Sequence, residues 1–389
     1  MKRVAVLCFE NPYTKPNDGA KNDMRTRIEA LKLNGDCAID VYAFNKPEEA
    51  PAAIEPSAYG IRHLYQYQVQ PFSAKGLLSG LPISVYKRFT PECVEELKHH
   101  SYDAIIYEGE HMSPYRLKDA THAKKHILRQ HDIESAYRRE LARSAPSRKY
   151  AAAQMLEANL YSRLERDIDR YFDAALFISK TEKEIFDRQY PNTGCKFLFM
   201  PPATEKFAEG PVIGEKEKEI LYFGNMELQN NLLSILWFAE QVFPRIRKSG
   251  GNVRLKIIGK ISEENREKLL NIAPDIEIIG YVEDLTEEIN RAAIIASPVL
   301  YGAGVKVKVI DALSYGQIVC ATSKTIEGTE LVPGIHLIVE DDPDQLANHC
   351  CRILKNRAAY VGMAQEGLSF VKANHSIKAQ AEMLRQVLK

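Results

Sequence analysis

A glycine-rich loop follows a strand-like apolar run in the stretch "SPVLYGAGVKVKVIDALSYGQIVCAT", residues 297–322. Gly302 and Gly304 lie directly after the run, where backbone N–H groups can face a ligand. A helix that begins near Val305 directs the positive end of its dipole at the same place, and that end favours phosphate. The pattern therefore predicts an anion site at the end of a strand.

Three charged residues follow this loop. Lys306 and Lys308 add full positive charges, and Asp311, one turn later, offers a carboxylate suited to the two hydroxyls of a ribose. The ordinary alternative is an ion pair between Lys308 and Asp311 on a helix surface, beside a turn that is common in α/β proteins. These residues alone leave the two interpretations evenly balanced.

Short β-branched apolar runs alternate with helical stretches along the whole chain, for example "VAVLCF" and "DAIIYEG" in the first half and "EILYFG" and "RLKIIG" in the second. This alternation predicts βαβ units and parallel sheets, with ligands at the carboxyl ends of strands. The chain has 389 residues, too many for one ordinary core, and residues 201–219 are rich in Pro, Gly and charge. We therefore predict an α/β fold with two Rossmann-like domains facing one another across a cleft.

The predicted domains are residues 1–203 and 204–372, and residues 373–389 form an amphipathic helix expected to pack back on the first domain. Lys plus Arg and Asp plus Glu both total 52, which argues against a dedicated nucleic-acid binder. Seven scattered cysteines without a C-x-x-C pair favour a reducing cytoplasm. The first apolar run is short and is followed by Glu10, Asn11 and Pro12, so it predicts a strand and not a signal peptide.

The order of motifs in the second half resembles a known enzyme family. "LYFGNMELQNNLLSILWFAEQVFPRIRK" is followed by "LKIIG", "IGYVED", the glycine-rich stretch and "SKTIEGTEL". This succession resembles the nucleotide-sugar domain of glycosyltransferase family 4, the glycosyl transferases group 1, among the retaining enzymes of GT-B architecture. The resemblance covers nearly the whole chain. It is specific in the second half and weaker in the first, where "HDIESAYRR" and "DIDRYFDAALFIS" carry it.

The resemblance implies a role for each matching residue. Lys308, with Lys306, would hold the diphosphate of the donor, and Asp311 would bind its ribose. The other residues implied to line the donor site are Gly224, Asn225, Gly302, Gly304, Glu327 and Gly328. In the first half, Gly19 and Ala20 match a Gly-Gly pair of the family, although a flexible polar loop explains them nearly as well.

Three departures from the family pattern bear on this assignment. Asp311 is shorter by a methylene than the usual Glu, and Ala303 stands where an upstream acid is common, as in a glycine-rich subgroup. The Arg and Lys that many relatives place after the first strand are absent, since the run is Asn225–Leu228. Lys260, after "LKIIG", is a further candidate for the phosphate charge.

His131 is the candidate catalytic residue of the first half. It ends the run "KKHILRQH" and matches the histidine that relatives place near the reacting sugar. A lone histidine is more often structural, and the resemblance favours function. His111, beside Glu108 and Glu110, is a second candidate at a strand end. Glu134 matches a family residue, or caps a helix that starts near Asp132.

We predict no metal site and no cofactor apart from the donor. The histidines and cysteines show neither H-x-x-x-H nor C-x-x-C spacing. Without a metal, lysines and backbone N–H groups would stabilise the departing diphosphate.

The predicted function is a retaining, metal-independent hexosyltransferase. It would move a sugar from a UDP- or GDP-sugar to a glycan or lipid-linked acceptor in cell-envelope polysaccharide synthesis, with Lys308, Asp311 and His131 as catalytic residues. One alternative is a nucleotide-sugar epimerase, which should need the carboxylates of Glu108 and Glu110. The other is a degenerate nucleotide-sugar-binding subunit.

The basic tract "YRRELARSAPSRKY", residues 137–150, has two interpretations. A solvated helix face is favoured over a contact with an anionic membrane. We therefore expect a cytoplasmic protein, and peripheral association with the inner face of a membrane stays open.

Overall fold

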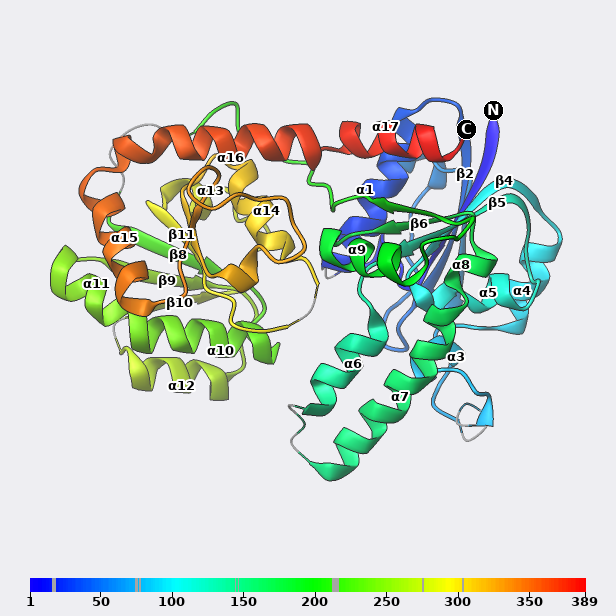
Figure 1. The fold of residues 1–389 in the computed structure, drawn as a ribbon, viewed down its shortest axis with the longest axis horizontal. Helices are drawn as coiled ribbons and strands as arrows, with labels where there is room; N and C mark the ends of the chain where they lie inside the picture. The colour runs from blue at the N-terminus through cyan, green and yellow to red at the C-terminus, as the bar shows by residue number, and fades with distance from the viewer. Residues whose placement is uncertain are drawn as a thin grey trace. The chain divides into compact units, whose positions relative to one another are not determined.

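The chain folds into two α/β units, each built on its own parallel sheet, in the computed structural model (Figure 1). The structure describes residues 1–15, 19–73, 76, 78–143, 145, 147–211, 217–274, 276–302 and 304–389. Unit 1 comprises Met1–Ala203 with Ile377–Lys389, and unit 2 comprises Thr204–Ser376. The predicted α/β class with two parallel sheets is confirmed.

The sheet of unit 1 has the strand order β3-β2-β1-β4-β5-β6-β7, and all of its neighbouring strands are parallel. Its strands are β1 (Lys2–Cys8), β2 (Cys37–Asn45), β3 (His63–Gln68), β4 (Ser101–Glu108), β5 (His122–Gln130), β6 (Ala174–Phe177) and β7 (Lys196–Phe199). Its described helices are α1 (Gly19–Leu33), α3 (Ile83–Tyr86), α4 (Pro91–Lys98), α5 (Pro114–Leu117), α6 (Glu134–Arg143), α7 (Arg148–Arg166), α8 (Ile168–Tyr171), α9 (Lys180–Gln189) and α17 (Ile377–Val387), with 3₁₀ turns at Pro56–Tyr59 and Glu110–Met112.

The sheet of unit 2 has the order β10-β9-β8-β11-β12-β13, again with parallel neighbours. Its strands are β8 (Glu219–Phe223), β9 (Arg254–Ile258), β10 (Glu277–Gly280), β11 (Ile294–Ser297), β12 (Val319–Ala321) and β13 (Ile338–Val339). Its described helices are α10 (Gln229–Trp237), a π-helical turn (Phe238–Val242), α11 (Phe243–Gly250), α12 (Glu263–Ile272), α13 (Thr286–Arg291), α14 (Val307–Ser314), α15 (Pro343–Lys355) and α16 (Val361–Asn374), with 3₁₀ turns at Ser323–Thr325 and Arg357–Tyr360.

Both sheets reverse their winding direction once, and this reversal determines where a ligand can bind. In unit 1 the chain moves outward from β1 to β3 and then returns to the other side of β1 as β4. In unit 2 the chain moves outward from β8 to β10 and then returns to the other side of β8 as β11. The loops diverge at such a point and leave a crevice at the carboxyl ends of the two strands. Gly19 follows β1, Gly224 and Asn225 follow β8, and the glycine-rich loop follows β11, whereas His131 follows the next strand, β5, and Glu327 and Gly328 follow β12.

The central strands have continuous apolar sequences because helices cover both faces of each sheet. In β1, Val4, Val6 and Cys8 enter the core on one face, while Ala5 and Leu7 enter the core on the other. This alternation is the two-residue period of a strand.

Helix α17 completes the core of unit 1 although it follows all of unit 2 in the sequence. Ala381, Leu384 and Leu388 are buried in the same core as the apolar face of α1. The side-chain amide of Asn34, at the end of α1, donates to the carbonyl oxygen of Ala381 at 3.1 Å. Among the described residues, no helix is both long and apolar enough to cross a membrane.

Candidate functional site

The glycine loop of unit 2, residues 298–306, is held beside the end of β11 by its own polar groups. The ammonium of Lys306 donates to the carbonyl oxygens of Gly302 (2.9 Å) and Gly304 (2.6 Å). Both glycines have left-handed backbone conformations, with φ of 106° and 76°, which other residues adopt only under strain. Ala303 lies outside the described residues. Lys306 therefore closes the loop as well as adding charge to it.

Lys308 lies in the first turn of α14, directly after the glycine loop. Its ammonium is 3.3 Å from the hydroxyl of Tyr222 and 3.2 Å from Oδ1 of Asn231, and it lies 4.6 Å from the centre of the Tyr222 ring. No carboxylate among the described residues pairs with it, so the predicted alternative of an ion pair with Asp311 is not formed. Burial, together with the charge of Lys306, lowers the pKa of Lys308 to about 7. An amine in this setting is stabilised as a cation when an anion arrives.

Asp311 lies one turn further along α14 and has a different partner. Its carboxylate accepts a hydrogen bond from Thr204, at the start of unit 2. Burial raises the pKa of Asp311 to about 6, although the bond from Thr204 opposes this shift. Lys308 and Asp311 are thus two partly desolvated charged groups on one short helix, and neither neutralises the other.

Asn231 joins the end of β8 to Lys308. Its Nδ2 donates to the backbone oxygen of Asn225 at 3.0 Å, while its Oδ1 accepts from the lysine. Gly224 approaches the neighbouring strand end so closely that a Cβ on Gly259 would lie 1.8 Å from the Gly224 oxygen. The structure therefore brings Gly224 and Asn225 close to Lys308 through Asn231. Sequence reasoning missed Tyr222 and Asn231, and the asparagine pair at the start of α10 was the available signal.

The remaining predicted residues of unit 2 lie around this centre with local partners. Glu327 is half exposed and pairs with Lys324, and Gly328 has φ of 79°. Their loop is joined to the end of β11 through Thr325, whose hydroxyl donates to the oxygen of Ser297. Lys260 pairs with Glu227 at 3.0 Å, so part of its charge is already compensated.

His131 follows β5 in unit 1, beside buried charges from three other places in the chain. Its Nε2 is 3.2 Å from Oδ2 of Asp23 and 3.6 Å from Oε2 of Glu108. Arg129 binds both oxygens of Asp23 (3.1 and 3.0 Å), and Arg27 pairs with both acids. Burial alone would raise the pKa of Asp23, but the two arginines and His131 hold it well below its usual range.

The atoms of Asp23, Glu108 and His131 lie within 4.8 Å of one another and could geometrically hold a metal ion. The spacing of residues along the sequence does not reveal this group, because the fold assembles it. Arg27 and Arg129 already bind its carboxylates, and a dication would have to compete with these two guanidinium groups. We therefore propose no metal site here.

Other candidates of unit 1 surround this cluster. Gly19 begins α1, the helix that places Asp23 beside His131 one turn later. His111 stacks on Phe9, with ring centres 5.0 Å apart, and burial lowers the pKa of His111 well below its usual value. Phe9 also contacts the edge of the His131 ring, with centres 5.5 Å apart.

The acids next to His111 are largely desolvated. Burial raises the pKa of Glu110 well above its usual value, and nearby Glu165 and Glu134 raise it further. Burial also raises the pKa of Glu134 to about 7, and this residue pairs with Arg138 at 3.4 Å. Helix α6 begins at Glu134 itself, so the capping alternative for this residue does not apply.

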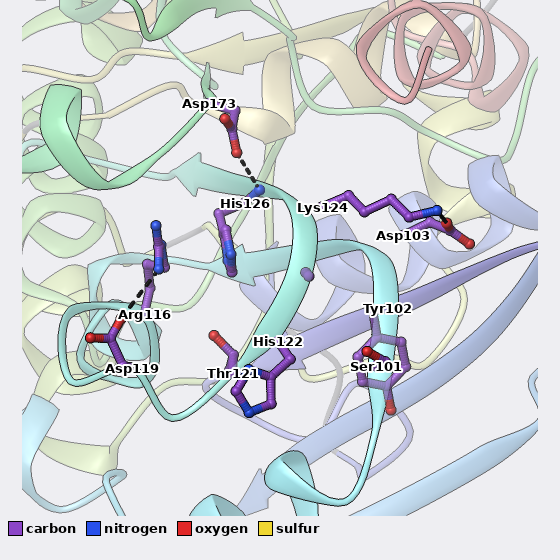
Figure 2. Close-up of a pocket in the computed structure, with 11 residues that line it drawn as sticks. Ser101, Tyr102, Asp103, Arg116, Asp119, Thr121, His122, Lys124, His126 and Asp173 are labelled. Carbon is purple, nitrogen blue, oxygen red and sulfur yellow. Dashed lines mark hydrogen bonds and ion pairs between the residues drawn. The ribbon is translucent and has the colours of Figure 1, made fainter.

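A separate pocket of about 780 Å³ lies at the opposite edge of the unit 1 sheet, at the amino ends of β4 and β5 (Figure 2). Its charged groups are satisfied within the pocket. Lys124 pairs with Asp103 (2.7 Å), and the Asp173 carboxylate accepts the backbone N–H of His126 (2.7 Å). Ligands of parallel α/β sheets bind at the other edge, so this pocket is not the candidate site.

Residues 217–356 match the family model described as "Glycosyl transferases group 1", and this segment contains β8, the glycine loop and α14. This segment of unit 2 is therefore similar to that family.

Solved structures of low sequence identity share the fold of the whole chain. Sucrose-phosphate synthase from Thermosynechococcus elongatus has a TM-score of 0.74 at 17% identity, covering 100% of this chain and 98% of that chain. WaaG, a glycosyltransferase involved in lipopolysaccharide biosynthesis, has a TM-score of 0.66 at 14% identity, covering 99% of each chain. HepE from Anabaena, solved with UDP-glucose, has a TM-score of 0.63 at 12% identity, covering 100% of this chain and 99% of that chain. The fold is GT-B, as predicted.

One curated sequence relative is an uncharacterized 44.6 kDa protein in the cps region of Klebsiella pneumoniae. It is 26% identical over 394 residues, covering 97% of each chain.

The low pKa of Lys308 predicts how the binding of a diphosphate would depend on pH. A diphosphate should raise that pKa, so binding above pH 7 should take up a proton at Lys308. Between pH 7.5 and 9 Asp311 is already ionised, and affinity should fall by roughly tenfold per pH unit while the bound-state pKa stays higher. Calorimetry in two buffers of different ionisation enthalpy measures the uptake. In Lys308→Met the uptake should vanish; uptake that persists would contradict this assignment.

The raised pKa of Asp311 predicts that the protein becomes more stable when the charge of this residue is removed. The pKa of Asp311, about 6, lies above the ordinary value of 3.8. The contribution of Asp311 to stability is therefore greatest below pH 3.8 and is lost as pH rises through 6. Asp311→Asn should therefore raise the free energy of unfolding by about 2 kcal/mol at pH 8, and with it the melting temperature by a few degrees. The gain should become progressively smaller towards pH 4.

The matched control for this effect is Asp284→Asn in the same unit. Hydrogen bonds from Thr286 lower the pKa of Asp284 to about 2, so removal of its charge should bring no gain in stability. Thermal melts of both variants from pH 4 to pH 8 make the comparison. Equal shifts for the two variants would show that Asp311 is not a desolvated carboxylate.

Proposed function

We propose that the protein is a retaining hexosyltransferase that uses a UDP- or GDP-sugar and a glycan or lipid-linked acceptor. The observation that carries the proposal is the placement of Lys308. This half-buried cation has no carboxylate partner among the described residues, and it lies between the glycine loop and the start of a helix. Such a position suits the diphosphate of a nucleotide sugar.

Each predicted residue has a proposed part in the reaction. The bond between the sugar C1 and the diphosphate oxygen breaks, and its electron pair leaves with the diphosphate. Lys308 and the backbone N–H groups of the glycine loop stabilise that charge. Asp311 accepts from the ribose, and Gly224, Asn225, Glu327 and Gly328 surround the donor. Lys306 keeps the loop closed.

The acceptor hydroxyl forms the new bond to C1 on the face that the diphosphate leaves, and its proton passes to a diphosphate oxygen. His131, held against Asp23 and Glu108, contacts the transferring sugar in this proposal. Unit 1, with Gly19 at the start of α1, would bind the acceptor. No step requires a metal ion.

Four similar proteins support the choice of donor and setting. HepE has been solved with UDP and glucose, and a TarM variant of S. aureus has been solved with UDP and α-GlcNAc-glycerol. The curated relative comes from a cps region, and WaaG acts in lipopolysaccharide biosynthesis. We infer a role in the cytoplasmic synthesis of a cell-envelope polysaccharide.

A direct assay separates this proposal from its alternatives. The protein is incubated with UDP-glucose, UDP-galactose, UDP-N-acetylglucosamine or GDP-mannose in EDTA, with and without glycan acceptors, and the anomeric products are followed by NMR. Transfer with retained configuration supports the proposal. A rearranged sugar without acceptor would establish an epimerase, and donor binding without turnover would establish a binding subunit.

A further inference from the structure

Helices α6 and α7 form an antiparallel hairpin that projects from the body of unit 1 (Figure 1). Its inner half is fixed by polar contacts within the protein. Arg138 pairs with Glu134, and Arg139 donates to the hydroxyl of Ser162 at 2.7 Å. Arg138 and Arg139 are therefore used internally.

The outer half differs in charge and in exposure. We call residues 141–156 the hairpin tip; Ser144 and Pro146 within it lie outside the described residues. The hairpin tip contains Arg143, Arg148 and Lys149 and no aspartate or glutamate. All three basic side chains are exposed, and none forms an ion pair with another described residue. This is a local charge of +3 on a protein whose net charge is zero.

Large apolar side chains are exposed among these charges. The exposed fractions are 42% for Tyr150, 42% for Met155 and 54% for Leu156. Arg148, Met155 and Leu156 are spaced seven and eight residues apart, so they share one face of α7. An exposed apolar group of this size next to cations on a projecting element indicates a contact surface.

Unit 1 has two more exposed apolar side chains in the segment before α3, apart from the hairpin tip. Phe72 and Leu78 are 63% and 88% exposed, and they precede α3. Helix α3 is joined to α7, because the N–H of Ile83 donates to Glu157 at 3.0 Å and Val85 packs against Tyr161.

We propose that the hairpin tip docks on an anionic lipid bilayer. Three cations would meet the lipid phosphates while Tyr150, Met155 and Leu156 enter the boundary between headgroups and acyl chains. This combination favours a bilayer over a nucleic acid, whose phosphates would satisfy the cations but leave Met155 and Leu156 in water. The proposal does not depend on the glycosyltransferase reaction.

Vesicle sedimentation of the full-length protein tests this surface. Phosphatidylcholine vesicles with phosphatidylglycerol should bind the protein, pure phosphatidylcholine should bind it at least about 30-fold less, and high salt should weaken the binding. The triple variant Arg143→Glu/Arg148→Glu/Lys149→Glu should lose the binding. Met155→Ser/Leu156→Ser should lose most of it while its charge is unchanged.

The control Lys248→Glu/Lys268→Glu/Arg291→Glu makes the same change in net charge at exposed positions of unit 2. It should bind vesicles within about twofold of the parent, because only nearby charges act within a Debye length. Equal losses for both triple variants would overturn the proposal, as would absence of binding at physiological salt. Retention on heparin without vesicle binding would assign the hairpin tip to a different polyanion and also overturn it. All variants change exposed residues, and thermal melts check that they are folded.

Discussion

Lys308→Ala should weaken the binding of the nucleoside diphosphate by about 100-fold or more. The wild-type amine already lies against Tyr222 and Asn231, so it is positioned before the ligand arrives. A charge-assisted hydrogen bond to phosphate contributes about 3 kcal/mol when the site is desolvated, and this energy corresponds to about 100-fold in the dissociation constant. Titration calorimetry measures the loss.

Two further variants make this result specific. Lys268→Ala removes an exposed lysine that pairs with Glu264 on α12, and nucleotide affinity should not change. Lys308→Arg keeps the charge but replaces a compact ammonium by a planar guanidinium, so it should recover only part of the affinity. If Lys308→Ala binds as tightly as the parent, the diphosphate does not lie at the start of α14.

His131→Ala should lower the rate of sugar transfer by about 100- to 1000-fold, while the affinity for the nucleotide alone stays within about twofold. The ring is held by the carboxylates of Asp23 and Glu108 and by the edge of Phe9, so its position is defined before substrate binds. A positioned group that contacts the reacting atoms contributes effects of this size. Initial rates at saturating donor measure the transfer.

The matched control is His122→Ala, which removes a histidine from the opposite end of the same strand, β5. His122 lines the pocket at the amino edge of the sheet (Figure 2), so its loss should leave the transfer rate unchanged. A His131→Ala protein with normal turnover would show that this histidine is structural. Equal losses for both variants would point to a general defect of the strand.

The sequence was sufficient to predict the fold class and the local elements around the proposed donor site. Alternating apolar runs and helices indicated parallel sheets, and a glycine loop after a strand indicated the start of a helix at an anion site. These are local signals, since Gly302, Gly304, Lys306 and Lys308 lie within seven residues of one another. Because these four residues are so close in the sequence, the local backbone conformation determines how they lie relative to one another.

The partners of these residues could not be predicted, because they come from distant parts of the chain. Tyr222 and Asn231 are 86 and 77 residues from Lys308, and Arg129 is 106 residues from Asp23. The two states of Asp311, paired with Lys308 or free of it, have the same sequence signature. Only the packed structure shows that Asp311 faces Thr204, and that burial is the largest cause of the pKa shifts of Lys308 and Asp311.

The most direct test of the nucleotide site is a calorimetric titration of the purified protein with UDP, GDP, ADP and CMP in EDTA. Micromolar binding of one nucleoside diphosphate without a divalent metal is the predicted result, and it would identify the base of the donor. Absence of binding to all four would contradict the assignment of the glycine loop and of Lys308, and with it the proposed transfer of a sugar from a nucleotide donor.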